Sequence, residues 1–306
     1  MRFINQNVLA TYHPVICLLY YVIVLTTTMF TTNPIVRGIS LFGALVACLL
    51  TIDRNRLVKN IRLAIGVCLV SAISNFLLVH SGKTELFNWS VELFGKVFNY
   101  SFTWEALFYG FSFGIMMAAV LLWFQTINEV LSSDKIVFLF GRWAPKIALV
   151  ISMVMRFIPL FQKQLLTIQS AQKGLGVTVT DNKKQQMLHG KDTFNSLLSW
   201  ALENAIDTSD SMNARGFGLK NRTNFTIYQF RRRDIWFLSL VIGLMMATLY
   251  FINNQTFSFY YYPRLRQMVE PIEGAIGYLT ISLLMLVPLL VELKERVKWH
   301  YLKSKI

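Results

Sequence analysis

Residues 106–127 read ALFYGFSFGIMMAAVLLWFQTI, a stretch without a single charged side chain. A helix needs about 20 mostly apolar residues to cross the hydrocarbon core of a bilayer. The stretch therefore predicts a transmembrane helix over Ala106–Ile127. A span of this kind places the chain among membrane proteins and excludes an ordinary soluble domain.

Five further stretches of the same kind occur along the chain. They are Val15–Thr31, Gly38–Ile52, Leu63–His80, Ile235–Ile252 and Gly274–Val291. The first has no small-residue cleavage site, so we expect a retained helix and not a removed signal peptide. No span carries a charged residue near its middle, which argues against a self-contained carrier coupled to protons or ions.

The composition agrees with a multi-span membrane protein. Of the 306 residues, 54% are hydrophobic and 15% are charged, against about 25% charged residues in soluble domains. Cys17, Cys48 and Cys68 all lie in apolar stretches and form no metal-binding pattern. We expect them to pack as small apolar side chains.

In a soluble protein, a net charge of +14 would suggest binding to nucleic acid. In this chain the distribution of the basic residues indicates a membrane topology instead. With both termini in the cytoplasm, 25 of the 30 Lys and Arg residues fall on the cytoplasmic side, as the positive-inside rule requires. We therefore expect a multi-pass protein of the cell membrane that contacts lipid and no nucleic acid. The aromatic run Phe257–Tyr262 is typical of an interfacial belt.

This topology divides the chain into three regions. Residues 1–127 hold four spans, residues 128–234 form a cytoplasmic segment, and residues 235–306 hold two spans and a basic tail. The fold class is an all-α membrane protein with about six transmembrane helices and two long cytoplasmic helices.

Helical spacing of apolar residues predicts the two cytoplasmic helices over Pro145–Lys173 and Thr193–Arg215. Pro145 suits a first helical turn, Pro159 predicts a kink, and Thr193 is a candidate N-cap. The apolar start of the first run resembles a seventh span, but Arg156 and Pro159 interrupt it. A helix lying along or partly in the membrane face fits this run better.

Three carboxylates share one face of the second run. Glu203, Asp207 and Asp210 are spaced four and three residues apart, which places them on one side of a helix. One reading is a solvated face. The other is pairing with bases on the first run, such as Arg156 or Lys163.

Both runs end in small residues. The first closes with Lys173-Gly174-Leu175-Gly176 and the second with Ala214-Arg215-Gly216. Two ordinary helix C-caps would explain both ends. Alternatively, small residues that allow close approach, with an Arg that offers a planar fork of donors, form a docking device for a partner.

The ordered set of motifs resembles the transmembrane T component of energy-coupling factor transporters, which are ABC-type importers of vitamins and transition-metal ions. The resemblance is carried by His13-Pro14, Asn33-Pro34, Gly141–Pro145, Met155–Leu160, Ala171–Lys173 and, most strongly, Glu203–Gly218. It implies that two long coupling helices join two ABC ATPase subunits to a small membrane-embedded S component. Each helix tip of that family carries an Ala-Arg-Gly motif that sits in an ATPase groove.

The resemblance assigns the second coupling motif to Ala214, Arg215 and Gly216, with Arg215 as the main contact to an ATPase. The first motif departs from the pattern, because Leu175 stands at the arginine position. Three explanations remain open: Lys173 supplies the charge, an apolar groove belongs to a second and different ATPase, or the coupling is asymmetric. We favour a mainly apolar groove contact.

The chain carries no recognisable catalytic site. None of its Gly-Lys pairs lies in a Walker A loop, and His13, His80, His189 and His300 form no zinc pattern. We therefore expect no cofactor on this chain, with ATP and Mg bound by the partner ATPases. The two rival hypotheses are a self-contained secondary carrier and a membrane-bound enzyme that uses Glu203, Asp207 and Asp210. The transported substrate is not encoded here, because the S component selects it in the family that the chain resembles.

Overall fold

The computed structural model describes residues 8–79, 84–93, 96–141, 144–176, 183–217, 228–262, 266–267 and 271–303. Of the positions named above, His80, Arg142, Trp143 and Gly218 lie outside these ranges. The chain divides into two compact units. The first combines Met1–Ser132 with Tyr228–Ile306, and the second is Ser133–Ile227.

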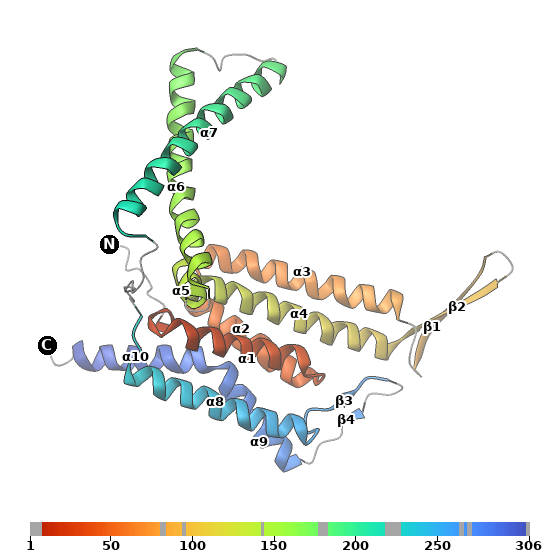
Figure 1. The fold of residues 1–306 in the computed structure, drawn as a ribbon. Coiled ribbons are helices and arrows are strands. Elements are labelled where there is room, and N and C mark those ends of the chain that lie inside the picture. The colour runs from red at the N-terminus through yellow and green to blue at the C-terminus, as the bar shows by residue number, and fades with distance from the viewer. Residues whose placement is uncertain are drawn as a thin grey trace. The chain divides into compact units, whose positions relative to one another are not determined.

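The first unit is a bundle of membrane helices with two small β-hairpins at one end (Figure 1). In chain order it contains a 3-10 turn (Val8–Thr11), α1 (Pro14–Phe30), α2 (Pro34–Thr51), α3 (Arg54–Leu78), β1 (Glu85–Leu93), β2 (Lys96–Thr103), α4 (Trp104–Val130), α8 (Arg232–Asn253), β3 (Phe259–Tyr260), β4 (Arg266–Gln267), α9 (Pro271–Met285) and α10 (Val287–Lys303). The helical membrane class predicted from the sequence is confirmed, while both hairpins are additions to it.

Length and hydropathy identify which helices could cross a membrane. In this unit α2, α3, α4 and α8 qualify singly, and α9 with α10 qualify as one broken span. Helix α1 is equally apolar but has 17 residues, about 25 Å of helix. The protein is therefore a multi-pass membrane protein.

The last predicted span, Gly274–Val291, is not one straight helix. It is divided into α9 and α10, which meet at an angle of 56°. The break adjoins Pro288, whose nitrogen cannot donate to the carbonyl of Leu284 four residues earlier. That carbonyl instead accepts a hydrogen bond of 3.2 Å from the hydroxyl of Tyr20 on α1. At the bend, a hydrogen bond between α1 and α9 thus replaces a backbone hydrogen bond within a helix.

Two residue pairs noted in the sequence start the first two helices. His13 and Asn33 are the N-caps of α1 and α2, each followed by a proline at the first helical position. The Asn33 side-chain oxygen accepts from the Ile35 amide at 2.9 Å. Helix α2 therefore begins at Pro34, earlier than predicted, because Asn-Pro is a start signal for a helix.

The core of the unit lies between α1, α2 and α4. Tyr20, Tyr21 and Trp123 are buried there. Ser40 connects the three helices, because its hydroxyl lies 2.6 Å from that of Thr28 and accepts from the indole nitrogen of Trp123 at 3.1 Å. The hydroxyls of Thr28 and Ser40 and the indole N–H of Trp123 are thus satisfied within the bundle.

Helices α3 and α4 pack through a pair of glycines. A Cβ placed on Gly110 would lie 2.6 Å from the Cβ of Asn75, and one on Gly114 would lie 2.7 Å from the carbonyl oxygen of Cys68. The spacing is Gly-x-x-x-Gly, which lets helix backbones approach closely in membranes.

A buried cation links the chain around the hairpin end of the bundle. Arg37, which directly precedes the predicted span Gly38–Ile52, is 5% exposed and lies in the first turn of α2. It donates to the carbonyl of Thr31 at 3.1 Å and to the hydroxyl of Ser112 at 2.9 Å. Ser112 in turn lies 2.7 Å from the hydroxyl of Tyr261. The aromatic run is thus only partly an interfacial belt, because Phe257 and Tyr261 are buried.

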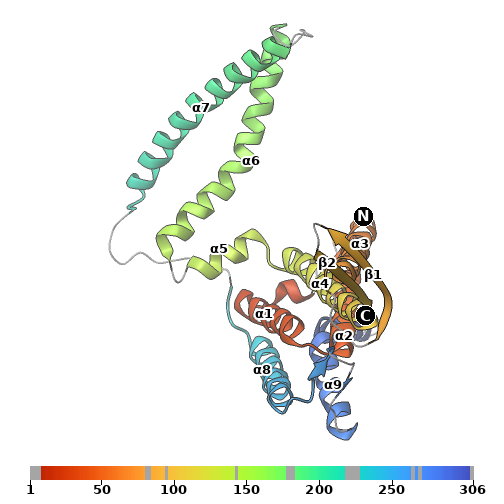
Figure 2. The same ribbon diagram turned by 90° about the vertical axis from the view of Figure 1, so that its right-hand side faces the viewer.

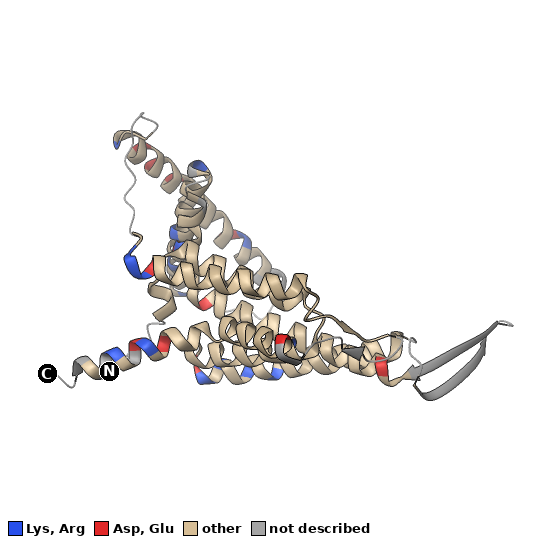
Figure 3. Ribbon diagram, turned by 90° about the horizontal axis from the view of Figure 1, so that it is seen from below, with Lys and Arg blue, Asp and Glu red and all other residues tan. Residues whose placement is uncertain are grey.

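Charge and cysteine placement follow the sequence reading. Within the first unit, Lys and Arg of α3, α8 and α10 lie at the end of the bundle away from the hairpins (Figure 3). Helix α3 begins at Arg54, not at the predicted Leu63, so four basic residues join its first turns. Cys17 and Cys48 are buried free thiols, and Cys68 is a half-buried one, as predicted.

The second unit is built around an antiparallel helix pair. It contains α5 (Ser133–Gly141), α6 (Pro145–Gly174) and α7 (Lys183–Ala214). Helices α6 and α7 lie together near the end of α6 and diverge towards its start (Figure 2). Helix α6 continues through Pro159. Its length and hydropathy also meet the criterion for a span, although none of its most apolar window is buried.

Candidate functional site at two helix tips

The end of α7 is a glycine-terminated cap. The Gly216 amide donates to the carbonyl of Asn213 at 3.0 Å, and the Phe217 amide donates to that of Met212 at 3.0 Å. This pair of bonds is the Schellman motif, which needs a left-handed residue directly after the helix. Gly216 fills that position with φ +78°. The glycine of the predicted second coupling motif is therefore required by the backbone geometry.

The end of α6 has matching geometry. Gly176 has φ +76°, and its amide donates to the carbonyl of Lys173 at 3.0 Å. In both tips the residue before the left-handed glycine is the C-cap of the helix. This residue is Leu175 in α6 and Arg215, which directly follows Ala214, in α7. Leu175 thus stands at the structural position that Arg215 occupies.

Both tip residues are accessible to a partner. Leu175 is 78% exposed, and Arg215 is exposed with no ion pair among the described residues. Phe217 beside Arg215 is 46% exposed. Because α6 and α7 run antiparallel, the two tips lie at opposite ends of the helix pair (Figures 1 and 2).

The contact between α6 and α7 differs from the predicted one. Thr193 was expected to cap the second helix, but α7 begins at Lys183 and Thr193 lies inside it. Its hydroxyl lies 2.8 Å from the side-chain oxygen of Gln172 on α6. Further along, the ring of Trp200 meets that of Phe161 edge-on at 5.6 Å. A polar contact and an aromatic contact therefore join the helices.

The structure shows no ion pair between the two helices within the part of the chain that it describes. Glu203, Asp207 and Asp210 of α7 and Arg156 of α6 are all exposed, and none forms an ion pair within the described residues. The helices meet instead through the faces of Thr193 and Trp200. The three carboxylates thus form an exposed acidic face on α7.

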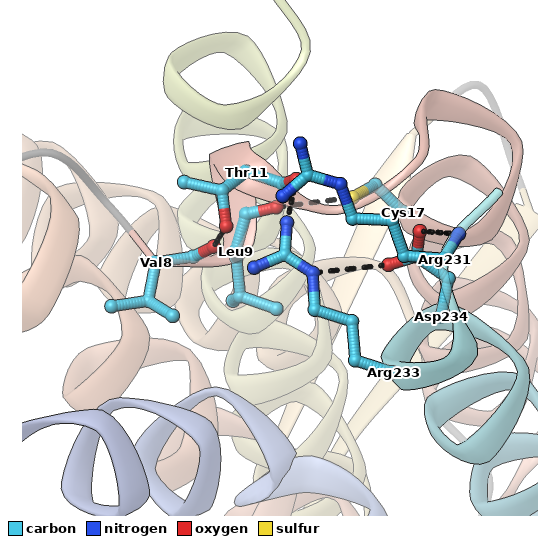
Figure 4. A network of polar contacts seen from close by, with 7 residues as sticks. All are labelled: Val8, Leu9, Thr11, Cys17, Arg231, Arg233 and Asp234. Carbon is cyan, nitrogen blue, oxygen red and sulfur yellow. Dashed lines mark hydrogen bonds and ion pairs between the residues drawn. The ribbon is translucent and has the colours of Figure 1, made fainter. Parts of the chain in front are cut away.

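A third group of residues holds the chain at the start of α8, and Figure 4 shows its members Thr11 and Arg233 together with Arg231 and Asp234. We call this group, formed by Thr11, Tyr12, His13, Phe230 and Arg233, the α8 anchor. The Arg233 guanidinium donates to the carbonyl of Thr11 at 2.7 Å and lies 5.1 Å from the ring centre of Tyr12. The ring of His13 stacks on Phe230 at 3.8 Å. Contacts between rings and cations of this kind are favourable.

Asp234 supports the anchor from within α8. Its side chain is 2% exposed, accepts from the Arg231 amide at 3.0 Å, and lies 3.7 Å from Arg233 Nε. Burial lowers the pKa of His13 below its ordinary value. The neutral His13 ring keeps an Nδ1 lone pair, which accepts from the Val15 amide at 3.4 Å.

Sequence reasoning noted His13-Pro14 but gave His13 no role, and it did not single out Arg233. The contacts of His13 with Phe230 and of Arg233 with Thr11 each join positions more than 200 residues apart in the chain. The available signal was the run Arg231-Arg232-Arg233-Asp234, which puts an acid in the first turn of an apolar helix, where it completes the helix start.

The described residues hold no group of three or more His, Cys, Asp or Glu side chains that could bind a metal ion. The candidate functional features of the described residues are the two exposed helix tips and the α8 anchor.

Together these features define a multi-pass helical membrane protein with a paired-helix unit inserted between the membrane helices α4 and α8. Residues 5–225 match the cobalt transport protein (CbiQ) family, and the chain belongs to that family. It is also similar to the energy-coupling factor transporter transmembrane protein EcfT of Lactobacillus helveticus (strain DPC 4571), with 32% identity over 108 residues. That match covers 33% of this chain and 38% of the relative's length.

Proposed function

We propose that this chain is the transmembrane coupling component of an energy-coupling factor importer. It transmits the ATP-driven motion of two partner ATPases to a small membrane-embedded S component, which binds a vitamin or a transition-metal ion. The chain itself hydrolyses no ATP, and the nucleotide and its Mg belong to the ATPases.

The observation that carries this proposal is the equivalence of the two helix tips. Each tip presents one exposed C-cap side chain directly before a glycine with positive φ. Such a glycine removes steric bulk beside the exposed side chain, so a groove can close over it. Two equivalent tips at opposite ends of one helix pair suit two separate docking partners better than one.

The difference between the tips supports two different ATPase subunits. Arg215 suits a groove that offers carboxylates or carbonyl oxygens, because its guanidinium has a planar fork of donors. Leu175 suits an apolar groove, because burying an exposed leucine is favourable while burying it against charges is not. The partners therefore carry grooves of different chemistry. The acidic face of Glu203, Asp207 and Asp210 stays free for further contacts.

The α8 anchor gives the motion a route into the bundle. The chain leaves the paired-helix unit at Ile227 and is held within a few residues by Phe230 and Arg233. These residues bind the start of α1 as well as the start of α8. A displacement of the paired helices would thus act on two membrane helices at once.

The proposed orientation puts both termini and the paired-helix unit in the cytoplasm of a cell whose membrane the protein spans. It rests on the positive-inside distribution and on the position of both hairpins at the end away from the basic residues (Figure 3). Helix α6 lies on the cytoplasmic side in this arrangement, along or partly in the membrane face.

The experiment that tests the proposal is affinity purification of the tagged chain in mild detergent, followed by mass spectrometry. We expect two ABC ATPase subunits and a small hydrophobic protein to copurify, and reconstituted transport to require all of them with ATP. Transport by the chain alone would contradict the proposal and favour a self-contained secondary carrier.

A further inference from the structure

Among the membrane helices α2, α3, α4 and α8, helix α3 is the least covered. Only 6% of its most apolar window is buried, against 44% for α4. It contacts α4 with one side only, through Cys68, Ser71 and Asn75, which meet Gly110 and Gly114. The rest of its surface therefore faces the surroundings of the bundle.

The side of α3 opposite that contact has an ordered composition. At 100° per residue, Lys59, Arg62, Gly66, Val70, Ile73 and Leu77 fall on the far face. We call these six residues the α3 track. The two cations come first, in the first three turns of α3, and the apolar residues follow them towards the end of the helix.

The two cations of the track are available to bind a group from outside the described part of the chain. Lys59 and Arg62 are exposed, and neither forms an ion pair among the described residues. Their neighbour Arg56 differs, because it pairs with Glu129 of α4 at 3.2 Å. Two unpaired cations at a membrane boundary attract an anionic group.

The apolar part of the track is an exposed surface that can accommodate a lipid acyl chain. Val70, Ile73 and Leu77 are 67%, 56% and 53% exposed. Gly66 lies between them and the cations, and a Cβ placed on it would meet nothing within 4 Å. The missing side chain leaves a notch in the helix surface directly beside Arg62.

The dimensions fit one leaflet. Arg62 and Ile73 are separated by about 16 Å along the helix, which is about half of the roughly 30 Å hydrocarbon core. A phospholipid with its headgroup at Lys59 and Arg62 would therefore lay one acyl chain over Gly66 and along Val70 and Ile73.

From these observations we propose that the α3 track binds an anionic phospholipid of the cytoplasmic leaflet. The phosphate of the headgroup contacts Lys59 and Arg62, and an acyl chain occupies the notch at Gly66. A protein partner is less suited to this face, because its charges are confined to one end and its remaining length is apolar.

The test uses the full chain, with the partners that copurify with it, in nanodiscs that contain phosphatidylcholine and a minor fraction of phosphatidylglycerol. Lipid retained after detergent extraction is measured by native mass spectrometry. Each cation near an anionic headgroup contributes roughly fivefold to binding. We expect Lys59→Ala with Arg62→Ala to reduce the preference for phosphatidylglycerol by roughly twentyfold.

A matched control removes the same charge elsewhere. Arg54→Ala with Lys298→Ala replaces two exposed cations that lie off the track, and this pair should keep the preference. Gly66→Leu fills the notch without changing charge, and it should lower retention of phosphatidylglycerol while the protein remains folded. Excess inorganic phosphate should not displace the lipid.

Any of the following results would overturn the proposal. The first is equal retention of the two lipids by the unaltered chain, and the second is unchanged preference in the Lys59 and Arg62 double variant. The third is displacement of the lipid by inorganic phosphate, or capture of a protein instead of lipid by a photocrosslinker placed at Val70.

Discussion

Leu175 and Arg215 occupy the same position in two equivalent helix ends. Each is the C-cap of a long helix and directly precedes a glycine in the left-handed region, at φ +76° after Leu175 and φ +78° after Arg215. The two residues have the same backbone position, but the Leu175 side chain is apolar and the Arg215 side chain carries a positive charge. We infer that the difference distinguishes two partners and has no role in helix termination.

Leu175→Arg tests this inference at the first tip. If the facing groove is apolar, a guanidinium there must be buried without a partner, so we expect selective loss of one of the two ATPase subunits. Leu175→Met keeps size and polarity and should retain both subunits. The measurement is the ratio of the two ATPases in the purified complex. Normal binding by Leu175→Arg would show that the groove accepts either side chain.

Arg233→Ala tests the α8 anchor. The change removes the hydrogen bond to the Thr11 carbonyl and the contact with the Tyr12 ring, and it leaves Asp234 buried without its neighbouring cation. We expect a loss of about 1 kcal/mol in the free energy of unfolding, because Arg233 is partly exposed. Thermal melting in detergent provides the measurement.

The neighbouring residue supplies the control for that change. Arg232 is exposed and carries the same charge, so Arg232→Ala should leave the melting temperature close to that of the unaltered protein. Equal melting temperatures for the two variants would contradict the anchoring role of Arg233.

His13 predicts a pH dependence of stability. Its pKa is lowered in the folded protein by burial, so the unfolded chain binds the proton more readily. The contribution of His13 is complete above about pH 6.5 and is lost as the pH falls through that value towards the folded pKa. Protonation also removes the Nδ1 acceptor that caps α1, a contribution of about 1 kcal/mol.

The measurement for His13 is the melting temperature as a function of pH. Asparagine is also a strong N-cap but does not titrate, so His13→Asn should retain stability near pH 7 and lose the decrease below about pH 6.5. A decrease of the same size in His13→Asn would assign the pH dependence to other groups.

Gly114→Ala tests the close packing of α3 on α4. The new methyl group would lie 2.7 Å from the carbonyl oxygen of Cys68, so the helices must separate. Overpacking of this kind costs about 1–3 kcal/mol. Gly243 of α8 is a control because a Cβ there meets nothing within 4 Å. Thermal melting should separate the two variants, and equal melting temperatures would show that α3 can shift freely.

Much of the fold followed from hydropathy and charge, because a membrane helix is long, apolar and free of charge for a simple physical reason. The exact helix starts did not follow, since His13 and Asn33 cap their helices before the apolar run begins. The bend at Pro288 was readable in principle, as a proline inside an apolar helix removes a backbone bond. The hairpin β1–β2 also left a signal, because polar and apolar residues alternate from Trp89 to Leu93 and from Phe98 to Phe102.

The candidate site was predictable to a different degree in each part. The glycines at the tips could be found locally, because a left-handed cap depends on a few neighbouring residues. The contacts that join α6 to α7 could not be found from local sequence, since three carboxylates on one face fit both a solvated surface and a set of ion pairs. The α8 anchor depends on contacts between Thr11 and Arg233 across most of the chain, and no local pattern reports such a contact.

The most direct test of the proposed function is copurification of the ATPase subunits with the tagged chain after Arg215→Glu. The control is Lys191→Glu, which reverses an exposed charge on the same helix away from the tip. We expect Arg215→Glu to lose at least one ATPase subunit while Lys191→Glu keeps both. Recovery of both ATPases with Arg215→Glu at the level of the unaltered chain would contradict the central claim that the tip of α7 is an ATPase docking site.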